Sequence, residues 1–173
     1  MNDEVFWQLI DQARTAMIED LAENMQALDS ALRQLSPEEL IAFKKRFTEL
    51  HNQAYRWDLW AAAYIMGGGC SDDGFMDFRD WLISRGQSVY EAALINPDSL
   101  ADIVDGEEEG QHEGYSYLVG RIIEELHPEY EKALFEQTSY KTIKFPSEPS
   151  GTAWEDDEET LAKLCPRLFA MYW

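Results

Sequence analysis

The sequence predicts an all-α fold, a single-domain helical bundle of six to eight helices around a central buried helix. Three observations predict it. Apolar residues recur at steps of three and four over most of the chain, capping signals precede two of these stretches, and residues 57–66 are apolar on nearly every side. The length of 173 residues fits one domain over residues 1–173, with a core large enough to need no disulfide or metal.

The first stretch with helical spacing runs from residue 3 to residue 35. Phe6, Ile10 and Ala13 begin its apolar face, and no Gly or Pro interrupts it. One long helix and two helices with a bend near Glu19–Asp20 fit this pattern equally well.

The next helix has the sharpest start signal in the chain. Ser36 can cap it, Pro37 suits its first position, and Glu39 can reach back to complete a capping box. Its apolar face continues to Ala54.

The buried helix expected at residues 57–66 ends at three consecutive glycines, residues 67–69. Ser71 or Asp72 then caps a helix that ends at Gly86. Glycines before a helix can cradle a phosphate, but no Lys follows here and the acidic residues would repel the anion. A tight turn between packed helices is therefore the preferred interpretation.

The pattern in the rest of the chain predicts shorter helices separated by turns and loops. Helices are expected at residues 88–94, after the turn at 96–99, at 115–126 with a continuation at 130–134, and from 155 to 165. Between them, a polar loop is expected at residues 105–114 and an irregular connection at residues 138–153.

The charge excludes several classes of partner. Fourteen Lys and Arg residues against 34 Asp and Glu residues give a net charge of −20 and a pI near 4.3. Nucleic acids and anionic membrane surfaces both require clustered basic residues, so neither is expected as a partner. A basic protein partner is compatible with this charge.

Nothing in the sequence indicates export or membrane insertion. The first four residues are acidic where a signal peptide would be basic, and the longest apolar run, residues 59–66, is far shorter than the roughly 18 residues of a bilayer span. Cys70 and Cys165 have no CxxC spacing, which is typical of reduced thiols. A cytoplasmic location is expected.

Residues 57–86 carry the most specific pattern in the chain. Within this segment the pattern consists of residues 59–64, Gly69, residues 71–75, Phe78-Arg79 and residues 81–83. Shorter matching features elsewhere in the chain are Phe6-Trp7, residues 96–100, Gly151, Trp154 and residues 165–168. With these features the whole chain resembles the bacterial family known only as domain of unknown function 4240. The resemblance implies a standalone soluble domain and supplies no activity, ligand or catalytic residue.

Acidic residues at the start of the 72–86 helix suggest a cation site. Asp72, Asp73, Asp77 and Asp80 have the hard carboxylate oxygens that Mg²⁺ prefers. At 100° per residue, however, Asp73, Asp77 and Asp80 lie at about 0°, 40° and −20°, opposite the apolar stripe of that helix. This geometry predicts a solvated outer face unless a second element, such as the loop at residues 107–109, covers it.

Aromatic and thiol side chains give further candidates. Trp60 and Trp81 are expected in the core or at its rim, although Trp also anchors interfaces. Arg79, at the border of the apolar face, is placed to pair with an inward Asp such as Asp58 or with a ligand carboxylate. Cys70 precedes a helix start, where a thiolate is favoured, but the neighbouring acidic residues oppose it.

Two functions fit these observations. The first is a protein-interaction module of the inhibitor, immunity or regulatory kind, with a basic protein as a possible partner and no cofactor or metal. Its candidate binding residues are Trp60, Asp72, Asp73, Arg79 and Trp81. The alternative is a small Mg²⁺-dependent phosphohydrolase that uses Asp72, Asp73 and Asp77. No catalytic constellation is evident in the sequence.

Overall fold

The computed structural model describes residues 1–16 and 21–173, with side chains described outside residues 16–22. It confirms the all-α prediction: the described residues form α-helices and short 3₁₀ helices and contain no strand. In chain order these are α1 (Asp3–Ala16), α2 (Leu21–Leu32), α3 (Pro37–Gln53), α4 (Trp57–Gly67), α5 (Asp72–Ser84), α6 (Gln87–Ile95), η1 (Pro97–Asp102), η2 (Tyr115–Tyr117), α7 (Leu118–Leu126), η3 (Pro128–Tyr130), α8 (Glu131–Thr138), α9 (Glu158–Leu164) and α10 (Pro166–Tyr172).

The described residues thus form ten α-helices, more than the six to eight expected. Pro128 and Pro166 explain part of the difference, since each opens a new helix where the pattern suggested a continuation or an end. Residues 3–35 contain two helices, α1 and α2, which pack against each other. The bend expected near Glu19–Asp20 lies outside the described residues.

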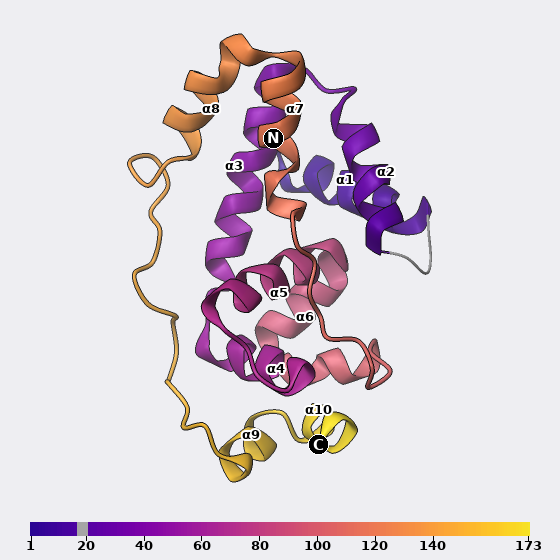
Figure 1. Ribbon diagram of the computed structural model, residues 1–173, viewed down its shortest axis with the longest axis vertical. Helices are drawn as coiled ribbons and strands as arrows, with labels where there is room; N and C mark the ends of the chain where they lie inside the picture. The colour runs from indigo at the N-terminus through magenta and orange to yellow at the C-terminus, as the bar shows by residue number, and fades with distance from the viewer. Residues whose placement is uncertain (17–20) are drawn as a thin grey trace.

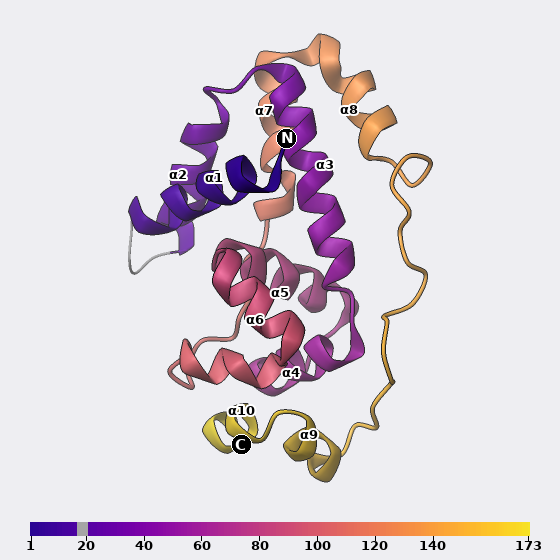
Figure 2. The same cartoon turned by 180° about the vertical axis from the view of Figure 1, so that it is seen from behind.

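The helices are arranged around the long helix α3 (Figure 1). α1 and α2 lie on one side of it, α7 and α8 lie near its N-terminal end, and α4, α5 and α6 lie beyond its C-terminal end. The segment between α8 and α9 runs along one flank of the molecule and places α9 and α10 against α4 (Figure 2). Buried apolar residues from Phe6 to Leu168 form one cluster.

Local signals set the ends of α3 as expected. The Ser36 side chain accepts a hydrogen bond from the backbone N–H of Glu39, and the Glu39 carboxylate accepts one from the backbone N–H of Ser36. The helix therefore begins at Pro37 and turns Phe43, Phe47 and Leu50 into the core.

The turn between α4 and α5 also has a clear local cause. Gly68 ends α4 in the left-handed region, with a φ of 60°, which a residue with a Cβ adopts at a cost. Ser71 caps α5, because its side chain accepts a hydrogen bond from the backbone N–H of Gly74. Asp72 is the first residue inside the helix and does not cap it.

α4 is largely buried, as expected, and α5 shares the centre of the core with it. Leu59, Ala62 and Ile65 of α4 are buried, while α5 is buried from Phe78 to Ser84 and contacts α1, α3, α4 and α6. Aromatic rings join the two helices, since Trp60 stacks on Phe75 with ring centres 4.7 Å apart. The centre of the fold therefore includes the helix with the acidic stripe.

The segment at residues 105–114, expected as a polar loop, packs along α5 together with η2. The backbone N–H groups of His112 and Ser116 donate hydrogen bonds to the Asp77 carbonyl and to the Asp80 carboxylate. Gly110 permits this close approach: it has a φ of 66°, and a Cβ there would lie 2.8 Å from Cε of Met66. The segment and η2 thus cover the part of this expected solvated face that carries Asp80, whereas Asp73 at the start of α5 stays exposed.

Candidate functional site

A cavity of about 390 Å³ opens between α3 and α5. η2, the end of α8 and the chain after α8 complete its walls. Its lining residues are Lys44, Phe47, Thr48, His51, Asn52, Tyr55, Asp72, Met76, Arg79, Ser116, Tyr117, Thr138, Phe145 and Pro146. The cavity has the size of a small-ligand site, roughly 300–1,000 Å³.

Two helices supply the functional side chains with the same spacing. α3 contributes Lys44, Thr48 and His51, at steps of four and three residues, and α5 contributes Asp72, Met76 and Arg79 at the same steps. Side chains at these steps share one face of a helix, so α3 presents three polar groups to the cavity and α5 presents Asp72 and Arg79 with the apolar Met76 between them. Two residues of the predicted site, Asp72 and Arg79, are among them.

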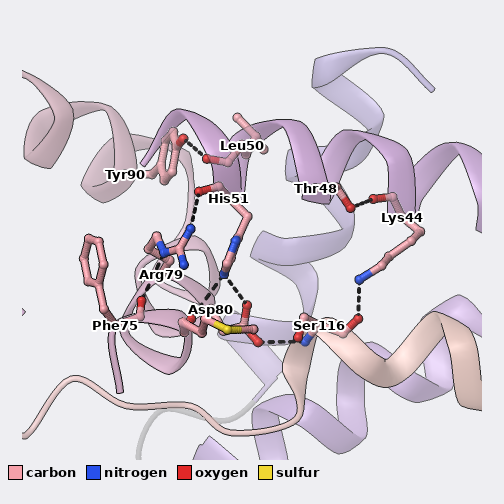
Figure 3. A network of polar contacts seen from close by, with 10 residues as sticks. Lys44, Thr48, Leu50, His51, Phe75, Arg79, Asp80, Tyr90 and Ser116 are labelled. Atoms are coloured by element: carbon pink, nitrogen blue, oxygen red, sulfur yellow. Dashed lines mark hydrogen bonds and ion pairs between the residues drawn. The ribbon is translucent and has the colours of Figure 1, made fainter. Parts of the chain in front are cut away.

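Asp80 is the buried charge beneath this cavity. Its side chain was expected on the solvated stripe of α5, and the structure contradicts this, because the residue is only 2% exposed. Its carboxylate accepts a hydrogen bond of 2.9 Å from the backbone N–H of Ser116 and lies 3.3 Å from Nε2 of His51 (Figure 3). It also attracts the charges of Lys44 and Arg79. A carboxylate with these partners can be buried, which a helical wheel does not reveal.

The position of His51 sets its protonation pattern. Nε2 lies 3.2 Å from the carbonyl oxygen of Met76 and 3.3 Å from the carboxylate of Asp80. Both oxygens only accept hydrogen bonds, so Nε2 carries a proton. The charge of the ring is then decided at Nδ1.

Arg79 is held at the base of the cavity. Its guanidinium donates from Nε to the Phe75 carbonyl and from Nη1 to the His51 carbonyl. The guanidinium carbon lies 4.7 Å from the ring centre of Tyr55 and 4.9 Å from that of Phe75. Burial lowers the pKa of Arg79 to about 10, against the attraction of Asp80, so it stays charged at neutral pH.

The pairing of Arg79 with Asp58 that was suggested from the sequence is wrong. Asp58 pairs with Arg56 at 2.5 Å instead. The two residues are neighbours at the start of α4, so this pair forms locally, whereas Arg79 points toward α3.

Lys44 supplies a second positive charge to the cavity, on the side of Asp80 that lies opposite to Arg79 (Figure 3). Its Nζ donates a hydrogen bond of 2.6 Å to the Ser116 carbonyl. Burial lowers the pKa of Lys44, and the attraction of Asp80 opposes this shift. Lys44 and Asp80 therefore hold the two polar groups of one residue of η2, its carbonyl and its N–H.

The other predicted site residues lie away from the cavity. Trp81 is fully buried, and its indole N–H donates to the Glu108 carboxylate at 2.7 Å. Trp60 is half-buried at the rim of the core, and its indole N–H donates to the carbonyl of Cys70. Asp73 is exposed on the first turn of α5. The structure therefore does not gather the five predicted residues at one place.

The carboxylates proposed for a cation site lie near one another, but they do not converge on one point that a metal ion could occupy. Burial raises the pKa of Asp77, and repulsion from Asp80, Glu113 and Asp73 adds to this shift. Within residues 1–16 and 21–173, no three His, Cys, Asp or Glu side chains are arranged to hold one metal ion. The geometry thus lends the Mg²⁺ alternative no support, and that alternative stays a prediction.

The thiols are unsuited to nucleophilic chemistry. Burial raises the pKa of Cys70 to about 11 and that of Cys165 to about 12. The helix start near Cys70 does not offset this effect, and Asp72 adds to it.

Sequence reasoning missed Lys44, His51 and Asp80 as members of one cluster. Lys44 lies among other basic residues of α3 and resembles a solvated side chain, and His51 and Asp80 gave no motif. The equal spacing of residues 44, 48 and 51 and of residues 72, 76 and 79 was the available signal. It predicts a shared site only once the packing of α3 against α5 is known.

Comparison with known proteins gives one match. Residues 1–125 match the model of a family described as a protein of unknown function (DUF4240). No curated protein and no solved structure matches. The similarity expected at Gly151, Trp154 and residues 165–168 lies beyond the matched residues. No helix in the described part of the chain is long and apolar enough to cross a membrane.

Proposed function

The chain belongs to this family of proteins of unknown function, and we propose that it is an acidic protein-interaction module, of the inhibitor, immunity or regulatory kind, that docks a basic protein. The observation that carries this proposal is a group of uncompensated carboxylates around the turn between α4 and α5. We call this group the acidic surface, and it consists of Asp72, Asp73, Asp77 and Glu113.

Contacts between two segments bring these carboxylates together. The side chain of Gln111 lies within 4 Å of the Cβ positions of both Gly67 and Gly74, so the 105–114 segment lies against the α4–α5 turn. Asp73 and Glu113 are near enough to Asp77 to raise its pKa. The surface is therefore built from two segments that lie far apart in the sequence.

The carboxylates of the acidic surface differ from those that the protein pairs with its own cations. Arg33 pairs with Asp29, for example, and Arg167 pairs with Asp102. Among the described residues, no Lys or Arg lies within ion-pair distance of a member of the acidic surface. The carboxylates of such a cluster repel one another and attract a basic protein. This attraction raises both the affinity and the association rate of the complex.

The test compares two variants that remove the same number of charges. The first carries Asp72→Asn, Asp73→Asn and Glu113→Gln on the acidic surface. The control carries Glu124→Gln, Glu129→Gln and Glu131→Gln, which are exposed residues of α7, η3 and α8 without ion pairs among the described residues. Each immobilised protein is presented with an extract of the source organism, and the retained proteins are then purified and titrated.

We expect a basic protein that the wild type and the control retain and that the acidic-surface variant loses. Its affinity should fall as salt rises, as expected for exposed charge pairs. Equal loss by both variants would show a general charge effect and contradict the proposal, as would a partner that binds the acidic-surface variant normally.

A further inference from the structure

We propose that the cavity between α3 and α5 is a binding site for a small monocarboxylate with an apolar or aromatic body. This site shares Asp72 with the acidic surface, but its argument does not depend on the proposed docking of a basic protein. The argument rests on the donors, the charges and the walls of the cavity.

Arg79 provides the first donor. It is 6% exposed, and its Nε and Nη1 already bond to the Phe75 and His51 carbonyls. Among the residues that the structure describes, its Nη2 has no hydrogen-bond partner. This atom can therefore donate to a ligand in the cavity that Arg79 lines, and an anionic oxygen is the strongest acceptor for a charged donor.

Lys44 provides the second donor. Its ammonium group has three N–H bonds, and the contact that the structure shows, with the Ser116 carbonyl, uses one of them. Lys44 and Arg79 stand on different helices and both line the same cavity, so each can donate to an anion bound there. The rigid anchoring of Arg79 reduces the entropy lost on binding.

The charge balance favours a monoanion over a dianion. Lys44 and Arg79 are offset by Asp80 beneath the cavity and by Asp72 on its wall. These two carboxylates already oppose both cations, so each additional negative charge on a ligand is less favourable than the first. A carboxylate brings one, whereas a phosphate monoester brings about 1.5–2.

The walls indicate the rest of the ligand. Phe47, Tyr55, Tyr117 and Phe145 line the cavity with aromatic rings, and Pro146 adds an apolar surface. Tyr117 and Phe145 are exposed and line the cavity, so their rings are accessible to a bound ligand. An apolar or aromatic body attached to the carboxylate would cover them.

The test is calorimetric titration with three probes at constant ionic strength. Phenylacetate carries the charge and the ring, phenylacetamide keeps the shape without the charge, and phenyl phosphate carries the ring with a higher charge. We expect saturable 1:1 binding of phenylacetate, with an affinity about tenfold or more above that of the other two probes.

Lys44→Gln and Lys45→Gln form a matched pair of variants. Both residues lie on α3 and both changes remove one positive charge, but Lys45 is exposed and does not line the cavity. Lys44→Gln should weaken phenylacetate binding about tenfold, and Lys45→Gln should leave it within about twofold. Arg79→Lys, checked for folding by circular dichroism, should weaken it as well.

Three results would overturn the proposal. The first is equal affinity for phenylacetate and phenylacetamide, which removes the charge requirement. The second is equal weakening by Lys44→Gln and Lys45→Gln. The third is the absence of saturable binding by phenylacetate, hexanoate and indole-3-acetate up to about 20 mM, well above the millimolar limit of a weak specific site.

Discussion

Nε2 of His51 lies 3.3 Å from the carboxylate of Asp80, which joins the C-terminal part of α3 to the middle of α5. The same carboxylate accepts a hydrogen bond from Ser116, and so η2 is joined to both helices. A buried acidic residue thus organises the cationic side of a cavity in a protein that is strongly acidic as a whole. Local charge, and not net charge, decides what this cavity can bind.

Removal of the Asp80 carboxylate should destabilise the fold. Asp80→Leu leaves the Ser116 N–H without its acceptor and the buried Arg79 without its counter-charge, so we expect a loss of about 3–5 kcal/mol. Asp80→Asn keeps an acceptor and should cost less. Urea unfolding measures both, with the exposed change Glu124→Gln as a control expected within about 0.5 kcal/mol. Equal and small losses for both Asp80 variants would contradict the assigned role.

The sequence predicted the elements of this fold better than their relations. The capping box at Ser36 and the glycine turn after residue 66 are local, and both were predicted correctly. Asp80 was misplaced because its burial depends on His51 and Ser116, which are 29 and 36 positions away in the chain. A helical wheel assumes that charged faces meet water, and this assumption fails where a second segment supplies partners.

The same reason limited the prediction of the site. Asp72 and Arg79, which were selected as candidate binding residues for their positions on one helix, both line the cavity. Trp60 and Trp81 were selected for residue type, and each directs its indole N–H to the protein itself. Lys44 could be found only through the packing of α3 on α5.

Asp77 should make stability depend on pH in a direction unusual for a carboxylate. Its pKa is raised by burial and by repulsion from Asp80, so the folded state binds the proton more tightly than the unfolded state. Asp77 therefore destabilises the fold above its raised pKa, and the penalty disappears as the pH falls below the ordinary value of about 4. We expect Asp77→Asn to be more stable than the wild type near neutral pH and equal to it near pH 4, by urea midpoints.

Asp102 is the control of opposite sign. Its hydrogen bond with Arg167 lowers its pKa, so the charged form stabilises the fold at neutral pH. This contribution is present above the ordinary pKa and is lost as the pH falls through the lowered one. Asp102→Asn should thus be less stable than the wild type near neutral pH. The same sign for both variants would refute the assignment for Asp77.

Trp60 and Trp81 should differ in their contribution to stability. Trp81 is fully buried, so Trp81→Ala should cost about 3–5 kcal/mol. Trp60 is half-buried between Trp57 and Phe75, so Trp60→Ala should cost less, about 2–3 kcal/mol. Trp60→Phe keeps the stacking, loses the hydrogen bond to Cys70 and should cost about 1 kcal/mol. Denaturant titration gives all three values, and a Trp60→Ala loss equal to that of Trp81→Ala would place Trp60 in the core.

Both thiols should react slowly in the folded protein. The pKa values of about 11 for Cys70 and about 12 for Cys165 leave little thiolate near neutral pH. With a thiol-specific chromogenic disulfide, we expect each to react more than about tenfold slower than free cysteine, with Cys165 slower than Cys70. Unfolding in urea should restore ordinary rates for both. A fast-reacting Cys70 in the native protein would instead revive its role as a nucleophile.

The most direct test of the cavity assignment is the location of a bound carboxylate by two-dimensional ¹⁵N–¹H NMR with phenylacetate. The account predicts saturable shifts concentrated at the amides of Thr48, Ser116 and Tyr117 and at the ring of His51, where α3, α5 and η2 meet. Shifts spread evenly over the surface, or concentrated at α9 and α10, would contradict it.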